Sequence, residues 1–132
     1  MRYALRMIRT ELSLRLPNNP GALAGVCRLL SNERVNVLAM MLDGTGQLRL
    51  VVDNHTHGGA ILRENHHQVT ERDVIVTAVP NGPGGLAPIL RLISDANVNV
   101  EYGYGGGSET SATASIVLGV DDAARASAAA GV

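Results

Sequence analysis

The sequence predicts an α+β fold in which one small unit of strands and helices occurs twice along the chain. The motif Pro-Asn-x-Pro-Gly-x-Leu stands at Pro17–Leu23 and again, 63 residues later, at Pro80–Leu86. A comparison without gaps at this offset finds matching residues as far as Val35–Val37 and Val98–Val100. In each copy an alternating apolar stretch leads into the motif and a helical pattern follows it, so each half is expected to hold a βαββαβ unit.

The pattern of the first half predicts strands and helices in the following order. Leucines at every second position in Glu11–Leu16 are typical of a half-buried strand. Pro20 is expected in the first turn of the next helix, where its missing N–H is not needed. Apolar residues from Leu23 to Leu30 form one face of this helix, which is expected to end near Arg34. The following elements are a strand at 35–42, a turn at 43–47, a strand at 48–53, a weak helix at 55–67 and a short strand at 68–71.

The second half repeats this order with two differences. Its elements are expected as a strand at Asp73–Val79, a helix at Pro83–Ala96, a strand at Val98–Gly103, a hairpin loop at 105–111, a strand at Ala112–Val120 and a helix at Asp121–Ala130. The pair Val120-Asp121 matches Val52-Asp53 at an offset of 68, so the second hairpin is five residues longer. We expect domains at 7–72 and 73–132, the second lacking its final strand. Two helices on one face of an antiparallel sheet give a ferredoxin-like arrangement.

Composition excludes several classes of protein. The formal net charge is −1 and the chain has no Phe or Trp, which speaks against a nucleic-acid partner. No apolar run approaches the roughly 20 residues that cross a bilayer, and a single cysteine fits a reducing compartment, so a cytoplasmic location is expected. No nucleophile stands with a base and an orienting partner, and we expect neither an enzyme nor a bound cofactor.

The duplicated stretch also resembles a known family. A strand that ends in Asn-x-Pro-Gly-x-Leu-Ala, followed by a helix and by Val-Asn-Val at the start of a strand, resembles the ACT domain. From about Met7 the whole chain is similar to stand-alone proteins built of two tandem ACT domains, and the VNVEYGY stretch at Val98–Tyr104 fits that subfamily. The resemblance implies a regulatory module that binds amino acids or similar small metabolites. Arg34 and Asn97 depart from it, because the family usually has glycine there to close the helix in a left-handed conformation.

The strand-to-helix loops are the candidate ligand site. A helix N-terminus offers unpaired N–H groups and partial positive charge to a carboxylate, glycine lets a ligand approach the backbone, and asparagine both donates and accepts hydrogen bonds. The alternative is that these residues only shape the turn. The resemblance implies that effector amino acids bind at this loop, in a crevice between neighbouring ACT domains. The candidate residues are Asn18, Asn19, Pro20, Gly21, Ala22, Leu23, Asn81, Gly82, Pro83, Gly84, Gly85 and Leu86.

Other motifs favour structural roles. The histidines lie on or beside one short helix, but their spacing lacks a matched third ligand, so no metal site is expected. They are His55, His57, His66 and His67. Cys27 is expected to be an inert, buried thiol on the apolar face of the first helix. Tyr102 and Tyr104 face either a ligand or the core, and the glycine-rich stretch at 103–108 is expected to be a flexible hairpin tip.

The sequence therefore predicts a non-enzymatic protein that binds a free amino acid. The alternatives are a regulatory subunit that docks on an amino-acid biosynthetic enzyme and, resting on the histidines alone, a metal-responsive module. A homodimer is expected, because the strand at Asp73–Val79 carries one charge and no proline and would leave an unprotected edge. The other explanation for that edge is a natural chain that continues beyond Val132.

Overall fold

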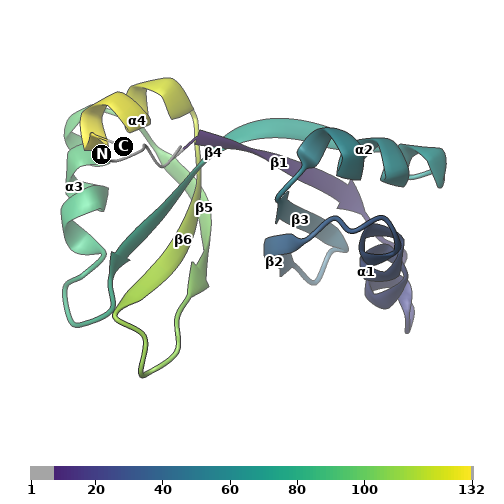
Figure 1. Ribbon diagram of the computed structural model, residues 1–132. Helices are drawn as coiled ribbons and strands as arrows, with labels where there is room; N and C mark the ends of the chain where they lie inside the picture. Colours follow the sequence, from purple (N-terminus) through teal and green to yellow (C-terminus); the bar gives the residue numbers. More distant parts are fainter. Residues whose placement is uncertain (1–7, 132) are drawn as a thin grey trace. The chain divides into compact units, whose positions relative to one another are not determined.

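The structure is a computed structural model that describes residues 8–131 (Figure 1). It divides into two compact units. The first spans Thr10–Arg72, and the second runs from Asp73 onward and includes Ile8 and Arg9. No helix within the described range is long and apolar enough to cross a membrane.

Each half of the chain contributes two helices. The first half contains β1 (Ile8–Arg15), α1 (Ala22–Asn32), β2 (Val37–Leu42), β3 (Gln47–Val52) and α2 (His55–Glu64). The second half contains α3 (Ala87–Asp95), β5 (Val100–Gly106), β6 (Thr113–Val120) and α4 (Ala123–Ala130). β4 (Thr70–Pro80) joins the halves, and the two strands expected at 68–71 and 73–79 are wrong as separate elements because they form this single strand. The duplicated βαββαβ order is otherwise confirmed.

In both units the strands are antiparallel where their register is defined. β3 pairs with both β1 and β2, and β6 pairs with both β4 and β5. The strand order is β2-β3-β1-β4 around the first unit, and β4 is followed by β6 and β5 in the second. β4 therefore has a neighbour on each side, and the open edge expected at Asp73–Val79 is wrong. The reason is that β1 begins at Ile8, before the leucine alternation starts, and Ile8 packs against the core of the second unit.

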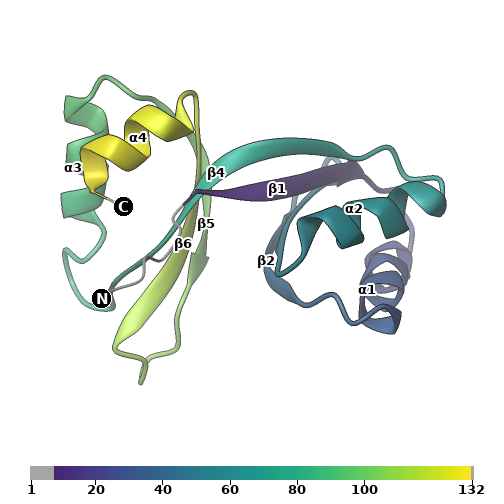
Figure 2. The same cartoon turned by 45° about the horizontal axis from the view of Figure 1, so that its top comes forward.

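Each unit has its own core between its helices and one face of its strands. In Figures 1 and 2, α3 and α4 lie together on one side of β4, β5 and β6, and α1 lies next to α2. The first core is rich in leucine and valine and is built from Leu12, Leu14, Leu16, Val26, Leu30, Val35, Leu48, Leu50, Val52, Ile61 and Leu62. The second core is smaller and is built from Ile75, Ile93, Val98, Leu118, Val120 and Ala126.

The two first helices end in the same way. After α1, Arg34 has φ 60° and the N–H of Val35 donates to the carbonyl of Leu30 at 2.9 Å. After α3, Asn97 has φ 62° and the next residue repeats that bond with Ile93 at 3.2 Å. These bonds belong to the Schellman motif, in which a left-handed residue closes the helix. Both positions adopt the left-handed conformation although neither residue is glycine.

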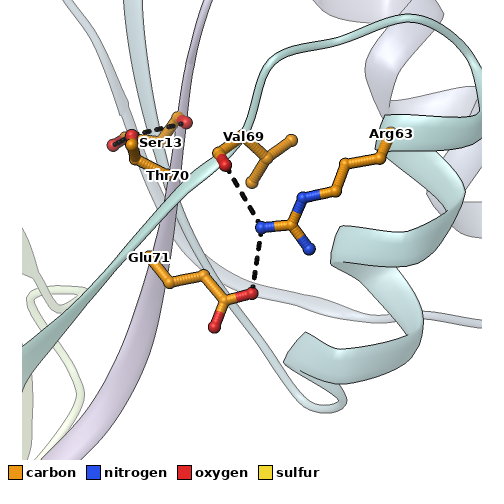
Figure 3. A network of polar contacts seen from close by, with 5 residues as sticks. All are labelled: Ser13, Arg63, Val69, Thr70 and Glu71. Atoms are coloured by element: carbon orange, nitrogen blue, oxygen red, sulfur yellow. Dashed lines mark hydrogen bonds and ion pairs between the residues drawn. The ribbon is translucent and has the colours of Figure 1, made fainter.

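The junction between α2 and β4 is held by polar contacts within the first unit (Figure 3). The Arg63 side chain extends from α2, and its Nη2 donates to the carbonyl of Val69 and to Oε2 of Glu71, both at 3.1 Å. The hydroxyl of Thr70, on β4, lies 3.1 Å from the hydroxyl of Ser13, on β1. These contacts fix the start of β4 beside β1.

Candidate functional site

We call residues Asn18–Leu23 the first loop and residues Asn81–Leu86 the second loop. Each loop leads from a strand to a helix, but the prolines lie outside the helices. α1 begins at Ala22 and α3 at Ala87, so the placement of Pro20 and Pro83 in a first turn is wrong. The reason is the glycine that follows each proline. Gly21 has φ 88° and Gly84 has φ 77°, and this left-handed conformation cannot belong to a right-handed helix.

The helices that follow the two loops begin without a side-chain cap. Neither α1 nor α3 has a side chain that accepts a hydrogen bond from its first turn. The other two helices are capped, α2 by Asn54, which accepts from the N–H of His57, and α4 by Asp122, which accepts from that of Arg125. The uncapped ends leave backbone N–H groups available to an anion.

The first loop lines a pocket of about 240 Å³ in the first unit. All of its candidate residues except Pro20 contribute to the lining. The other wall comes from the hairpin between β2 and β3, including Leu42 and Asp43. The pocket therefore combines a helix N-terminus, two asparagines and one carboxylate.

Asp43 is held in place by its own hairpin. Its Oδ1 accepts hydrogen bonds from the Thr45 hydroxyl at 2.6 Å, from the Thr45 N–H at 2.9 Å and from the Gln47 N–H at 3.2 Å. These bonds, led by that from the Thr45 hydroxyl and assisted by the charge of Arg15, lower the pKa of Asp43 below its ordinary value of 3.8. Asp43 is therefore an anion at neutral pH, and Oδ2 takes part in none of these three bonds.

The second loop lines a different kind of pocket. This pocket is about 540 Å³ and lies between β4 and the helices α3 and α4. Of the candidate residues, Pro83, Gly84 and Gly85 line it, whereas Asn81, Gly82 and Leu86 do not. The rest of its wall is mainly apolar and includes Val79, Ile89, Leu92 and Ala130.

The two duplicated asparagines make different contacts. Nδ2 of Asn81 donates to the carbonyls of Ser108 and Ser111, each at 2.8 Å, and its backbone N–H donates to the carbonyl of Ala112 at 3.0 Å. The side chain of Asn18 forms no hydrogen bond with any residue in the range 8–131. Sequence comparison could not show this difference, because the residues themselves are identical.

The remaining candidates lie away from both pockets. His57 Nε2 lies 3.4 Å from Glu33 Oε1 on the surface, and residues 8–131 contain no group of three side chains that could hold a metal ion. Cys27 is partly exposed, so the expectation of a buried thiol is wrong; α1 turns this residue toward the rim of its apolar face.

The tyrosines stack on each other. The rings of Tyr102 and Tyr104 are 6.4 Å apart at an interplanar angle of 11°. Their cross-strand partners are Gly119 and Val117, whereas Leu118 belongs to the helix-covered core. Cross-strand partners share a face of a sheet, so the rings lie on the face opposite the helices.

Comparisons with known proteins agree with this fold. The model of a family described as the ACT domain pair matches residues 7–128. Protein BT0572 from Bacteroides thetaiotaomicron has a similar structure, with a TM-score of 0.84, 28% identity, and coverage of 93% of this chain and 86% of that one. The regulatory subunit of aspartate kinase from Thermus thermophilus matches with a TM-score of 0.69, 20% identity, and coverage of 97% and 92%. The corresponding subunit from Thermus flavus has a TM-score of 0.67, 17% identity, and coverage of 97% and 94%. No curated protein matches the chain.

Proposed function

The chain belongs to the family of ACT domain pairs, and we propose on this basis that it binds a free amino acid and regulates metabolism without catalysing a reaction. The family match confirms the resemblance predicted from the duplicated motif, and the fold is the expected pair of ferredoxin-like units. The proposal includes a cytoplasmic location, where free amino acids are available to such a protein.

The observation that carries this proposal is the pair of uncapped helix N-termini behind the duplicated loops. An amino acid carries a carboxylate, which backbone N–H groups at such an end stabilise. It also carries an ammonium group, which an asparagine oxygen or a carboxylate accepts. The first pocket supplies both kinds of partner through α1, Asn18 and Asp43.

The test is a thermal-shift screen of the purified chain against the standard amino acids, followed by calorimetry. A ligand at 100 times its dissociation constant adds about 2.7 kcal/mol to the free energy of unfolding, so the melting temperature rises. Two analogues of each hit are matched controls: the amine that lacks the carboxylate and the 2-hydroxy acid that lacks the ammonium. Both should bind at least tenfold more weakly. A complete panel without a shift or heat would contradict the proposal.

We propose further that the protein is a homodimer through β2 rather than β4. β2 stands at the end of the strand order and contains neither charge nor proline. Leu38, Met40 and Leu42 on this strand are 49%, 38% and 40% exposed. An apolar strand at a sheet edge is a ready site for pairing with a second chain.

Light scattering tests the dimer, because a monomer has a mass of 13.8 kDa. Leu38→Lys should give the monomer, since a charge on the edge opposes pairing. Leu92→Lys is the matched control, because Leu92 is 45% exposed but lies on α3. A wild-type chain that is monomeric at micromolar concentration would refute this part of the proposal.

The second candidate is a regulatory subunit that docks on a biosynthetic enzyme. It is supported by the two Thermus structures, which are regulatory subunits of aspartate kinase. Affinity purification from the source cells, with and without the amino acid found in the screen, distinguishes the candidates. A stoichiometric enzyme partner supports docking, and recovery of the chain alone supports the stand-alone protein.

A further inference from the structure

We propose that the second unit has a ligand site of its own in the hollow between β4, α3 and α4, and that this site takes a neutral, largely apolar molecule with one O–H or N–H donor. The hollow is the pocket of about 540 Å³ described above, and we call it the second pocket. Its ligand differs in chemistry from a free amino acid, so this inference goes beyond the proposed function and does not depend on it.

The second pocket lies where the repeat has lost two large core side chains. In the first unit these are Leu14 on β1 and Leu62 on α2, which are 2% and 0% exposed. Leu14 corresponds to Thr77 at the offset of 63, and Leu62 corresponds to Ala130 at the offset of 68. Thr77 and Ala130 both line the second pocket, from β4 and α4. Two smaller side chains at these positions leave the space that leucines occupy in the first unit.

Thr77 has the one polar side chain among the described residues that line this pocket. The residue is 5% exposed, so water has little access to its hydroxyl. Within residues 8–131 this hydroxyl donates to the carbonyl of Ala78 over 3.4 Å, beyond the usual range of about 2.5–3.0 Å for two oxygens. No group in the same range donates to Oγ1, although a hydroxyl oxygen accepts two hydrogen bonds. A buried hydroxyl with so little compensation is costly, and a ligand donor removes that cost.

The other walls of the second pocket determine the remaining properties of the ligand. They are apolar and include the side chains of Val79, Ile89 and Leu92. None of the described residues in the lining is charged, and a charge moved into an apolar hollow without a partner is costly. The ligand is therefore neutral, which excludes zwitterionic amino acids and carboxylate anions. The volume of about 540 Å³ lies within the range of about 300–1,000 Å³ that is typical of small-molecule sites.

The test uses 2-naphthol as the probe, because it is neutral at pH 7 and combines an apolar ring system with one O–H donor. Naphthalene lacks the donor, and 2-naphthoate carries a negative charge. Calorimetry and the melting temperature of the purified chain measure binding of each compound. We expect 2-naphthol to bind and to raise the melting temperature. Naphthalene should bind about twofold to tenfold more weakly, the range of one net hydrogen bond, and 2-naphthoate should not bind.

Two variants locate the site. Thr77→Val keeps the shape of the side chain without its hydroxyl, so it should weaken 2-naphthol about twofold to tenfold and leave the affinity for naphthalene unchanged. Ala130→Leu restores the residue of the first repeat. It should raise the melting temperature of the ligand-free protein and abolish the binding of both compounds, because leucine fills the hollow. Ala128→Leu is the matched control, since Ala128 is an exposed residue of the same helix outside the lining, and it should bind both compounds as wild type does.

Three results would overturn this inference. The first is a wild-type chain that binds neither 2-naphthol nor naphthalene. The second is an unchanged affinity for 2-naphthol in Ala130→Leu, which would place the probe elsewhere. The third is a lower melting temperature of ligand-free Ala130→Leu, which would show that the space is already filled. The screen against amino acids is independent: a chain that binds 2-naphthol but no amino acid loses the proposed function and keeps this site, and the converse result removes this site alone.

Discussion

Glu11 and Arg49 form an ion pair inside the first unit, with Oε1 of the carboxylate 3.7 Å from Nη1 of the guanidinium. The Glu11 side chain is fully buried, whereas that of Arg49 is 23% exposed. Glu11 lies on β1 and Arg49 on β3, two positions apart in the antiparallel register, so both side chains lie on the same face of the sheet. A carboxylate taken out of water is costly unless a cation and hydrogen bonds compensate it, so this pair fixes how β1 and β3 face each other.

Glu11→Ala should therefore lower the free energy of unfolding by about 2–3 kcal/mol, because it leaves the guanidinium without its buried partner. Urea denaturation measures the loss. The control is the double variant Glu11→Leu with Arg49→Met, which removes both charges and should recover most of the stability. A loss below about 0.5 kcal/mol for Glu11→Ala would show that the pair contributes nothing.

Arg34→Gly should stabilise the protein. The left-handed conformation at φ 60° costs an L-residue about 1–2 kcal/mol, and glycine removes this cost. Glycine also loses more conformational entropy on folding, which costs about 0.5–1 kcal/mol. The expected net gain is about 0.5–1 kcal/mol, measured by thermal and urea unfolding. Asn97→Gly is the matched control and should gain less, because asparagine tolerates φ 62° better. Equal gains would show that the side chain of Arg34 carries no extra strain.

Gly119→Ala should destabilise the second unit, since an added Cβ would collide with the ring of Tyr102. Overpacking of a closed site costs about 1–3 kcal/mol. The same substitution in a Tyr102→Ala background should cost less, because the ring is gone. A double-mutant cycle measures this coupling. Identical costs in both backgrounds would mean that the ring moves aside freely.

Asp43 should make the stability of the protein depend on pH in the acid range. Its pKa is lowered in the folded state, so its contribution is present above the unfolded value near 3.8 and disappears as the pH falls through the lower folded value. The difference in melting temperature between wild type and Asp43→Asn should be constant at neutral pH and shrink below about pH 4. A difference that does not change between pH 6 and pH 3 would contradict the hydrogen-bonded carboxylate.

The sequence predicts the duplicated fold well because its periodicities are local. Alternating leucines define β1, and the pattern from Leu23 to Leu30 defines α1. The helix starts were placed too early because a left-handed glycine after each proline is a property of backbone geometry, which proline itself does not reveal. The open edge expected at β4 is wrong because β1, which is distant in the sequence, is its neighbour in the strand order.

Only part of the candidate site can be predicted from the sequence. The duplicated motif identifies the loops, and all but one residue of the first loop line a pocket. The sequence does not identify Asp43 as a site residue, because its pattern is that of an ordinary turn. Only the fold brings Asp43 close to the first loop. The feature of the sequence that could have indicated Asp43 is its position directly after β2, in the hairpin that lines the same pocket as the first loop. The difference between Asn18 and Asn81 depends on the longer hairpin, whose path no local pattern predicts.

The start of β1 has a consequence for folding during synthesis. Ile8 is synthesised before every residue of the core against which it packs, a core that includes Ile75, Leu118 and Ala126. The first unit can complete its core while translation continues, but the opening residues of β1 must wait for the second core before they are buried. Closing so long a stretch of chain is entropically costly and slow. The burial of Ile8 therefore depends on residues that are synthesised well after it.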